Sequence, residues 1–120
     1  MLIGVMLLLA ALPEGLDFVV VGAPGNPPCP LTKQGTVAYA FEMGAGEITN
    51  GQYAAFLNAV AATADPYNLY SPNMDSGLFG GIGRREERGR YVYTALEGHE
   101  SLPVVYVSWN DAREFCEKIG

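Results

Sequence analysis

The stretch EITNGQYAAFLNAV, residues 47–60, decides the fold because it carries the clearest helix signal in the chain. Thr49 is suited to the N-cap position, since its hydroxyl can accept a hydrogen bond from a free backbone N–H of the first turn. Gln52 can reach back to the backbone of Thr49 and complete a capping box. Apolar residues then recur at helical spacing on one face, at Tyr53, Phe56, Leu57, Val60 and Ala61. The pattern predicts an amphipathic helix.

A second helix signal, VSWNDAREFC at residues 107–116, echoes the first one near the C-terminus. Ser108 and Asp111 have the spacing of another capping box, S-x-x-D. The expected apolar face consists of Trp109, Ala112, Phe115, Cys116 and Ile119. On that face Cys116 is interpreted as a buried small hydrophobe or as half of a structural disulfide, rather than as a nucleophile.

The composition describes one loop-rich globular domain. The chain has 120 residues, of which 49% are apolar and 17% are charged, so a disordered tail is excluded. Fifteen glycines and eight prolines favour a loop-rich fold with limited regular structure, and the helix and strand patterns together predict the α+β class. The net charge of −6 argues against nucleic-acid binding, which requires a basic face.

Four further segments have strand-like patterns: residues 16–22, 36–43, 90–94 and 103–107, the last predicted to be buried. The glycine-rich segment at residues 67–83 is expected to be irregular, and it lacks the Lys-Ser/Thr of a phosphate-binding loop. The arginines that follow, at positions 84, 85, 88 and 90, are interrupted by Glu86 and Glu87. This mixture favours a solvated loop with local ion pairs over an anion-binding site.

The residues alone do not point to a catalytic, cofactor-binding or metal-ligating site. No serine lies in a G-x-S-x-G elbow, and the single histidine, His99, has no partner at metal-ligand spacing. Cys29 and Cys116 could form one bridge, and the sequence does not decide whether they do. The expected list of site residues for this chain is therefore empty.

Residues 1–12, MLIGVMLLLAAL, are almost uniformly apolar but too few to cross a bilayer as a helix. Their length and leucine content match the apolar core of a secretory signal, although no Lys or Arg precedes them. The alternatives are a true start that lies upstream, an atypical signal, and a buried helix or strand. We expect residues 1–15 to be a signal peptide or its remnant, with the mature chain secreted or periplasmic and without a membrane span.

The motifs of both helices resemble a known family. Residues 47–53 followed by Phe56 resemble the E-V-T-N-x-Q-Y-x-x-F signature of the formylglycine-generating, sulfatase-modifying factor family, and residues 41–44 resemble the F-x-M-G that precedes it. Residues 103–112 followed by Phe115 and Cys116 are similar to its P-V-x-x-V-S-W-x-D-A-x-x-Y-C block. The resemblance, which is to a secreted bacterial branch, covers nearly everything after Leu16.

The resemblance implies a C-type-lectin-like α+β fold with much loop. The family's oxidases use copper and two cysteines to oxidise a cysteine of a sulfatase to formylglycine, while relatives include iron-dependent sulfoxide synthases. In the family, the second block is followed by a segment like G-x-R-L-P-T-E-A-E-W-E, and the copper-binding cysteines lie further on. No residue of this chain is therefore assigned to the metal.

Residues 16–120 are accordingly expected to be the N-terminal part of a family domain, an incomplete fold without catalysis of its own. Copper, or iron as in relatives, and a sulfatase or other protein substrate are implied only for a full-length member. Cys116 matches a cysteine that tends to bridge to the remaining part, and Cys29 matches none. We expect marginal stability, because the apolar faces of both helices would lack partners. The alternative is an exported, lectin-like binding module without catalysis.

Overall fold

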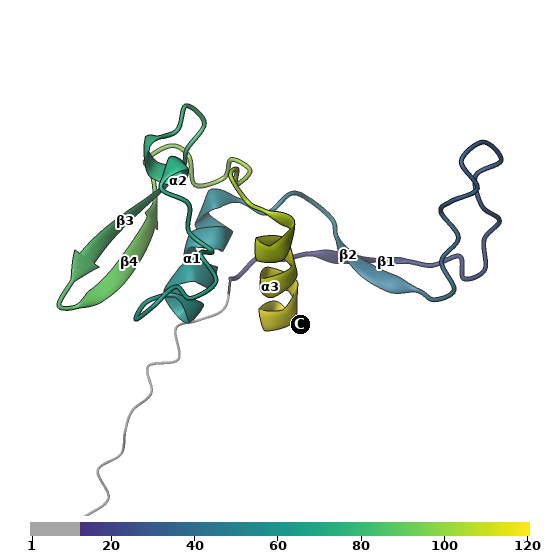
Figure 1. Ribbon diagram of the computed structural model, residues 1–120, viewed down its shortest axis with the longest axis horizontal. Helices are drawn as coiled ribbons and strands as arrows, with labels where there is room; N and C mark the ends of the chain where they lie inside the picture. Colours follow the sequence, from purple (N-terminus) through teal and green to yellow (C-terminus); the bar gives the residue numbers. More distant parts are fainter. Residues whose placement is uncertain (1–12) are drawn as a thin grey trace, which may run out of the picture. The chain divides into compact units, whose positions relative to one another are not determined.

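A computed structural model describes residues 13–120, and the first twelve residues of the predicted signal segment lie outside that range (Figure 1). The chain divides into two compact units. The hairpin unit is Leu16–Glu47, and the helical unit is Ile48–Gly120 together with residues 13–15. Together the units contain short helices, two small sheets and many loops, which confirms the predicted α+β class. The C-type-lectin-like arrangement stays a prediction.

The hairpin unit contains two antiparallel strands, β1 (Phe18–Val21) and β2 (Phe41–Gly44). The first strand agrees with the prediction, whereas residues 36–40 of the second do not form a strand. The reason lies at Val37, whose backbone groups are used inside the connecting loop. Its N–H donates to Asn26 Oδ1 at 3.1 Å and its carbonyl accepts from the N–H of Gly25 at 2.8 Å. The strand ladder therefore begins only at Phe41.

The helical unit is organised around α1 (Asn50–Val60). The predicted capping box is present: the N–H of Gln52 donates to Thr49 Oγ1 at 3.2 Å, and the N–H of Thr49 donates to Gln52 Oε1 at 3.0 Å. The apolar face is buried as predicted at Tyr53, Phe56, Leu57 and Ala61. The expectation that this face would lack partners is wrong for α1.

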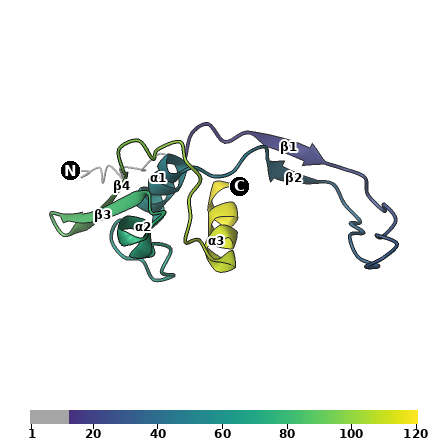
Figure 2. The same ribbon diagram turned by 90° about the horizontal axis from the view of Figure 1, so that it is seen from above.

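Two strands that pack beside α1 form an antiparallel hairpin, β3 (Ile82–Glu87) and β4 (Arg90–Ala95) (Figure 2). The prediction of a solvated loop at residues 84–90 is wrong. Arg88 and Gly89 both have positive φ, at 51° and 75°, which is the geometry of a two-residue hairpin turn. The turn lets the arginine- and glutamate-rich segment pair along the whole of β4. A one-turn helix, α2 (Asn73–Ser76), precedes β3 in the segment expected to be irregular.

The second predicted helix, α3 (Trp109–Ile119), also begins with the expected capping box. The N–H of Asp111 donates to Ser108 Oγ at 3.2 Å, and the N–H of Ser108 donates to Asp111 Oδ2 at 2.8 Å. The buried strand predicted just before it, at residues 103–107, is wrong. Only an isolated bridge, Thr49 to Pro103, forms there, because the segment that pairs with it turns into α1 after Thr49.

The core of the helical unit is formed by α1, the segment after it with α2, the β3–β4 hairpin and Phe115 of α3. Phe115 reaches α1 from α3, with its ring centroid 4.9 Å from that of Phe56 and 6.1 Å from that of Tyr53. The buried apolar side chains are Tyr53, Ala54, Phe56, Leu57, Ala61, Leu69, Tyr70, Met74, Ile82, Tyr93 and Phe115. Among residues 13–120, no helix combines the length and the apolar composition needed to cross a membrane.

Candidate functional site

The two cysteines are exposed and free, and they lie in different units. Cys29 is in the loop between β1 and β2, and Cys116 is on α3. The prediction that Cys116 is buried is wrong. Phe115 takes the position that faces α1, and the next residue on a helix points about 100° away from it.

The described residues do not fit the copper centre that the family resemblance implies. Within residues 13–120, no group of three or more His, Cys, Asp or Glu side chains is placed to hold a metal ion. His99 takes part in the fold through its backbone instead. Its carbonyl accepts from Asn50 Nδ2 at 2.9 Å, and its N–H donates to the carbonyl of Leu96 at 2.9 Å.

The T-N-G-Q part of the first motif holds the chain that leads to α3. Asn50, which is 2% exposed, donates its backbone N–H to the carbonyl of Leu102 at 2.9 Å. Gly51 donates to the carbonyl of Glu100 at 3.0 Å. Gly81 leaves room for the Asn50 side chain, because a Cβ at that position would lie 2.2 Å from Asn50 Nδ2. These signature residues therefore act in the fold by joining the start of α1 to residues 99–102.

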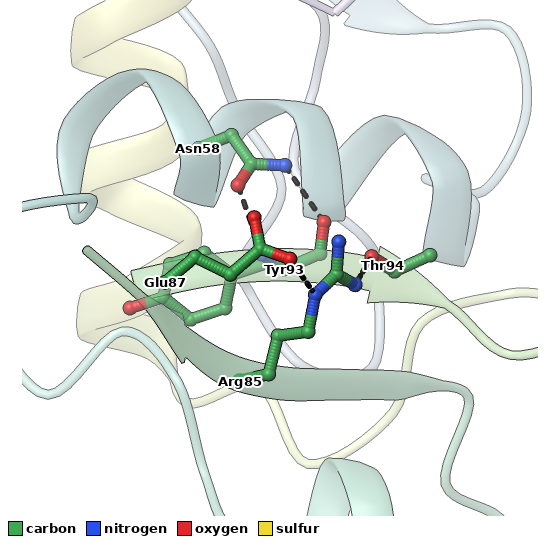
Figure 3. Close-up of polar contacts among 5 residues, drawn as sticks. All are labelled: Asn58, Arg85, Glu87, Tyr93 and Thr94. Atoms are coloured by element: carbon green, nitrogen blue, oxygen red, sulfur yellow. Dashed lines mark hydrogen bonds and ion pairs between the residues drawn. The ribbon is translucent and has the colours of Figure 1, made fainter. Parts of the chain in front are cut away.

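Asn58 covers the free edge of β4, as Figure 3 shows. Its Nδ2 donates to the carbonyl of Tyr93 at 2.7 Å, and the N–H of Tyr93 donates to Asn58 Oδ1 at 2.9 Å. The side-chain amide thus replaces a neighbouring strand at this point of the edge. On the solvent side of the hairpin, Arg85 donates to Glu87 Oε1 at 2.7 Å and to Thr94 Oγ1 at 3.1 Å. This exposed pair is the local ion pairing expected from the sequence.

Three tyrosines in the core serve as neutral hydrogen-bond donors. Burial raises the pKa of Tyr53, whose hydroxyl donates to the carbonyl of Leu69 at 2.8 Å. Burial also raises the pKa of Tyr70 and that of Tyr93, while the nearby Arg84 lowers both in part. Their hydroxyls donate to the carbonyls of Ile82 and Ala61. With raised pKa values, these groups stay protonated near neutral pH and hold the loops in place.

The helical unit has an exposed surface on the outer face of α3, defined by Trp109, Ala112 and Cys116. All three are exposed, and the Trp109 side chain is 74% exposed. Arg113 lies beside the indole, with its Cζ 5.6 Å from the ring centroid. The expectation that the apolar face of α3 would lack partners therefore holds at Trp109, Ala112 and Cys116, but it is wrong at Phe115, which is buried against α1. A large exposed aromatic on an ordered helix is typical of an interaction surface.

A shallow cavity of about 280 Å³ lies next to this helix, between α1, α3 and the segment after α1. Its lining is mostly apolar, with two charged side chains from α3 at one side: Phe56, Val60, Pro66, Tyr67, Leu69, Glu114 and Lys118. It holds no cluster of convergent polar groups of the kind that orients a small substrate. The outer face of α3, rather than this cavity, is therefore the candidate functional surface.

Comparison with protein families gives a match over most of the chain. The family model described as the sulfatase-modifying factor enzyme 1-like domain, FGE-sulfatase, matches residues 19–120. No curated protein and no solved structure matches the chain. The match covers both capping-box motifs and the hairpin unit from its first strand onward.

Proposed function

Because the chain belongs to the sulfatase-modifying factor enzyme 1-like domain family through residues 19–120, we propose that it forms the scaffold part of a domain that oxidises a sulfatase cysteine to formylglycine. In this proposal the residues that carry the oxidation lie in another part of the domain. Copper is the proposed metal there, and a sulfatase is the proposed protein substrate. Export to the periplasm or the medium belongs to the same proposal.

The observation that carries the proposal is the exposed outer face of α3. The helix is capped at its start and fixed to α1 through Phe115, so it is an ordered element of the unit. Yet Trp109, at its first turn, is 74% exposed. Fully burying an aromatic side chain of this size stabilises a protein by about 1.5–3 kcal/mol. A partner that covers this face would gain that free energy.

The family resemblance supports one candidate partner for this face. The block that includes α3 is followed in the family by the segment that leads to the copper-binding cysteines. We therefore propose that this catalytic part packs on Trp109, Ala112 and Cys116. The capping boxes of α1 and α3 would then set the angle at which the catalytic part meets the scaffold.

The proposal is tested with the polypeptide produced from the natural locus, whatever its length. The protein is supplied with copper and a peptide that carries a sulfatase cysteine, and the aldehyde of formylglycine is detected with a hydroxylamine probe. We expect aldehyde formation from the natural product and none from the 120-residue chain. Conversion by the 120-residue chain would overturn the scaffold role. A natural product that binds the peptide without forming aldehyde would favour the non-catalytic binding module.

A further inference from the structure

Arg84 occupies a different position from the other arginines of the hairpin. Its place in the register, opposite Tyr93, puts it on the same face of the hairpin as Ile82, which is buried against α1. Its guanidinium carbon lies 4.7 Å from the centroid of the Tyr70 ring and 4.5 Å from that of Tyr91. Both distances are within the range of cation–π attraction, so two rings hold this one cation.

The two rings are fixed before any ligand arrives. The backbone N–H of Tyr70 donates to Asp65 Oδ2 at 2.9 Å, and its hydroxyl donates to the carbonyl of Ile82 at 3.3 Å. The N–H of Tyr91 donates to the carbonyl of Ala62 at 2.7 Å, which ties its backbone to the end of α1, and its ring lies 6.4 Å from that of Tyr93, centroid to centroid. A guanidinium that rests on fixed rings loses little further freedom when its N–H groups bind an acceptor.

Arg84 has no carboxylate partner among the residues that the structure describes. The ion pairs within residues 13–120 are Arg85 with Glu87 and Arg113 with Glu114 and Glu117, and none involves Arg84. The Arg84 side chain is exposed. A guanidinium carries five N–H donors, of which a carboxylate needs two. The structure therefore presents an oriented cation whose charge is not neutralised.

From these contacts we infer that Arg84, together with the rings of Tyr70 and Tyr91, forms a binding site for a single carboxylate, carried by an acidic side chain or a chain end of a peptide. Two parallel N–H groups of a guanidinium match the two oxygens of a carboxylate. Glu86, the next residue on the same face, and the net charge of −6 repel any anion, but they repel a singly charged carboxylate less than a phosphate dianion. This inference is independent of the proposed oxidase function.

The test observes the arginine side chain directly, in the 120-residue chain labelled with ¹⁵N. The Nε–Hε resonance of Arg84 is followed by NMR while sodium acetate, and then a short peptide ending in aspartate, is added at constant ionic strength. We expect a saturable shift at Arg84 and none at Arg85, which is already paired with Glu87. Acetamide, which has the same shape without the charge, should cause no saturable shift.

Four variants separate recognition by this site from general attraction to the hairpin. Arg84→Lys keeps the charge but removes the planar pair of donors, and we expect it to weaken peptide binding about tenfold or more. Arg85→Lys is the matched control and should bind as the parent does. Tyr91→Leu, which removes one ring, should weaken binding several-fold, whereas Tyr91→Phe, which keeps the ring, should not.

The affinities of acetate and of the peptide for Arg84 show whether the site recognises a carboxylate alone or a carboxylate within a peptide. If acetate and the peptide bind Arg84 with similar affinity, the site recognises the carboxylate alone. If the peptide binds more than about tenfold tighter, neighbouring peptide contacts add to it. Either result supports the inference. A shift that never saturates, or an Arg85→Lys loss as large as that of Arg84→Lys, would overturn it.

Discussion

Removing the side-chain amide of Asn58 should loosen the β3–β4 hairpin from α1. In Asn58→Ala, the carbonyl and the N–H of Tyr93 both lose their partner on the free edge of β4. Each lost bond to a partly buried backbone group costs about 1–3 kcal/mol. Because Asn58 is only half-buried, water can replace part of each bond. We therefore expect a loss of about 2–3 kcal/mol in the free energy of unfolding.

Urea unfolding followed by circular dichroism measures this loss. With an m-value of about 1.5 kcal/mol/M, the midpoint should fall by about 1–2 M. Hydrogen exchange gives a local readout, since the Tyr93 amide should exchange faster in the variant. Asn58→Asp keeps the acceptor but points a carboxylate at the carbonyl of Tyr93, so it should destabilise the chain as well.

The matched control is Thr94→Ala on the solvent side of β4. It removes only the exposed hydrogen bond from Arg85, and the expected change is within about 0.5 kcal/mol. An Asn58→Ala variant as stable as the parent, with an unchanged Tyr93 amide, would refute the role of Asn58. So would a Thr94→Ala variant that loses as much stability as Asn58→Ala.

Three further predictions concern packing, pH and the outer face of α3. Gly81→Ala should lower the free energy of unfolding by at least about 1–3 kcal/mol in urea, because its Cβ would overlap the buried side chain of Asn50. Gly83→Ala should cost much less, because the nearest atom to its Cβ would be 3.5 Å away. Equal losses in the two variants would contradict this packing. Above the ordinary tyrosine pKa of 10.0, stability should fall by up to about 1.4 kcal/mol per pH unit for Tyr53, because its raised folded-state pKa means that the unfolded chain loses the proton first. Unfolding titrations that show no decline above that pH would contradict the burial of its hydroxyl. Trp109→Ala should change the free energy of unfolding of the 120-residue chain by less than about 0.5 kcal/mol, because Trp109 is exposed. Phe115→Ala should lower it by about 3–5 kcal/mol, because Phe115 is buried. The reverse order would mean that Trp109, and not Phe115, faces α1.

The elements that the sequence predicted well are those whose signal is local. Both capping boxes depend on two residues three positions apart, and both form with the expected atoms. The apolar stripe of α1 is also reliable, because a continuous core lies against it. When the contact that fixes an element joins residues only a few positions apart, the sequence pattern is sufficient to predict that element.

The elements that the sequence missed depend on distant partners or on unusual turn residues. Residues 103–107 have a strand-like composition, but Thr49, which pairs with Pro103, is the N-cap of α1, so the pairing cannot continue. The β3–β4 turn uses Arg88 and Gly89 instead of the common Asn-Gly, so the hairpin was not recognised. The exposure of Cys116 depends on which face of α3 meets α1, and periodicity alone placed it on the same stripe as Phe115.

For the candidate site, the sequence predicted the family and the exposed apolar residues of α3 other than Cys116 and Phe115, but not the contact of Arg84 with two tyrosines. That contact joins residues from the loop after α1 and from both strands of the hairpin. Once the turn at Arg88 and Gly89 is recognised, the register brings Arg84 opposite Tyr93, with Tyr91 two residues along the same face. The turn was therefore the one signal that could have revealed this cluster.

The central claim is that the catalytic part of the domain covers the outer face of α3, and the reactivity of Cys116 tests it most directly. The 120-residue chain and the natural-length product are treated with a maleimide under reducing conditions, and labelled peptides are quantified by mass spectrometry. Cys29, exposed in the loop of the hairpin unit, is the internal reference. We predict rapid labelling of Cys116 in the 120-residue chain and strong protection in the natural-length product. Equal labelling of Cys116 in the two proteins would contradict the account.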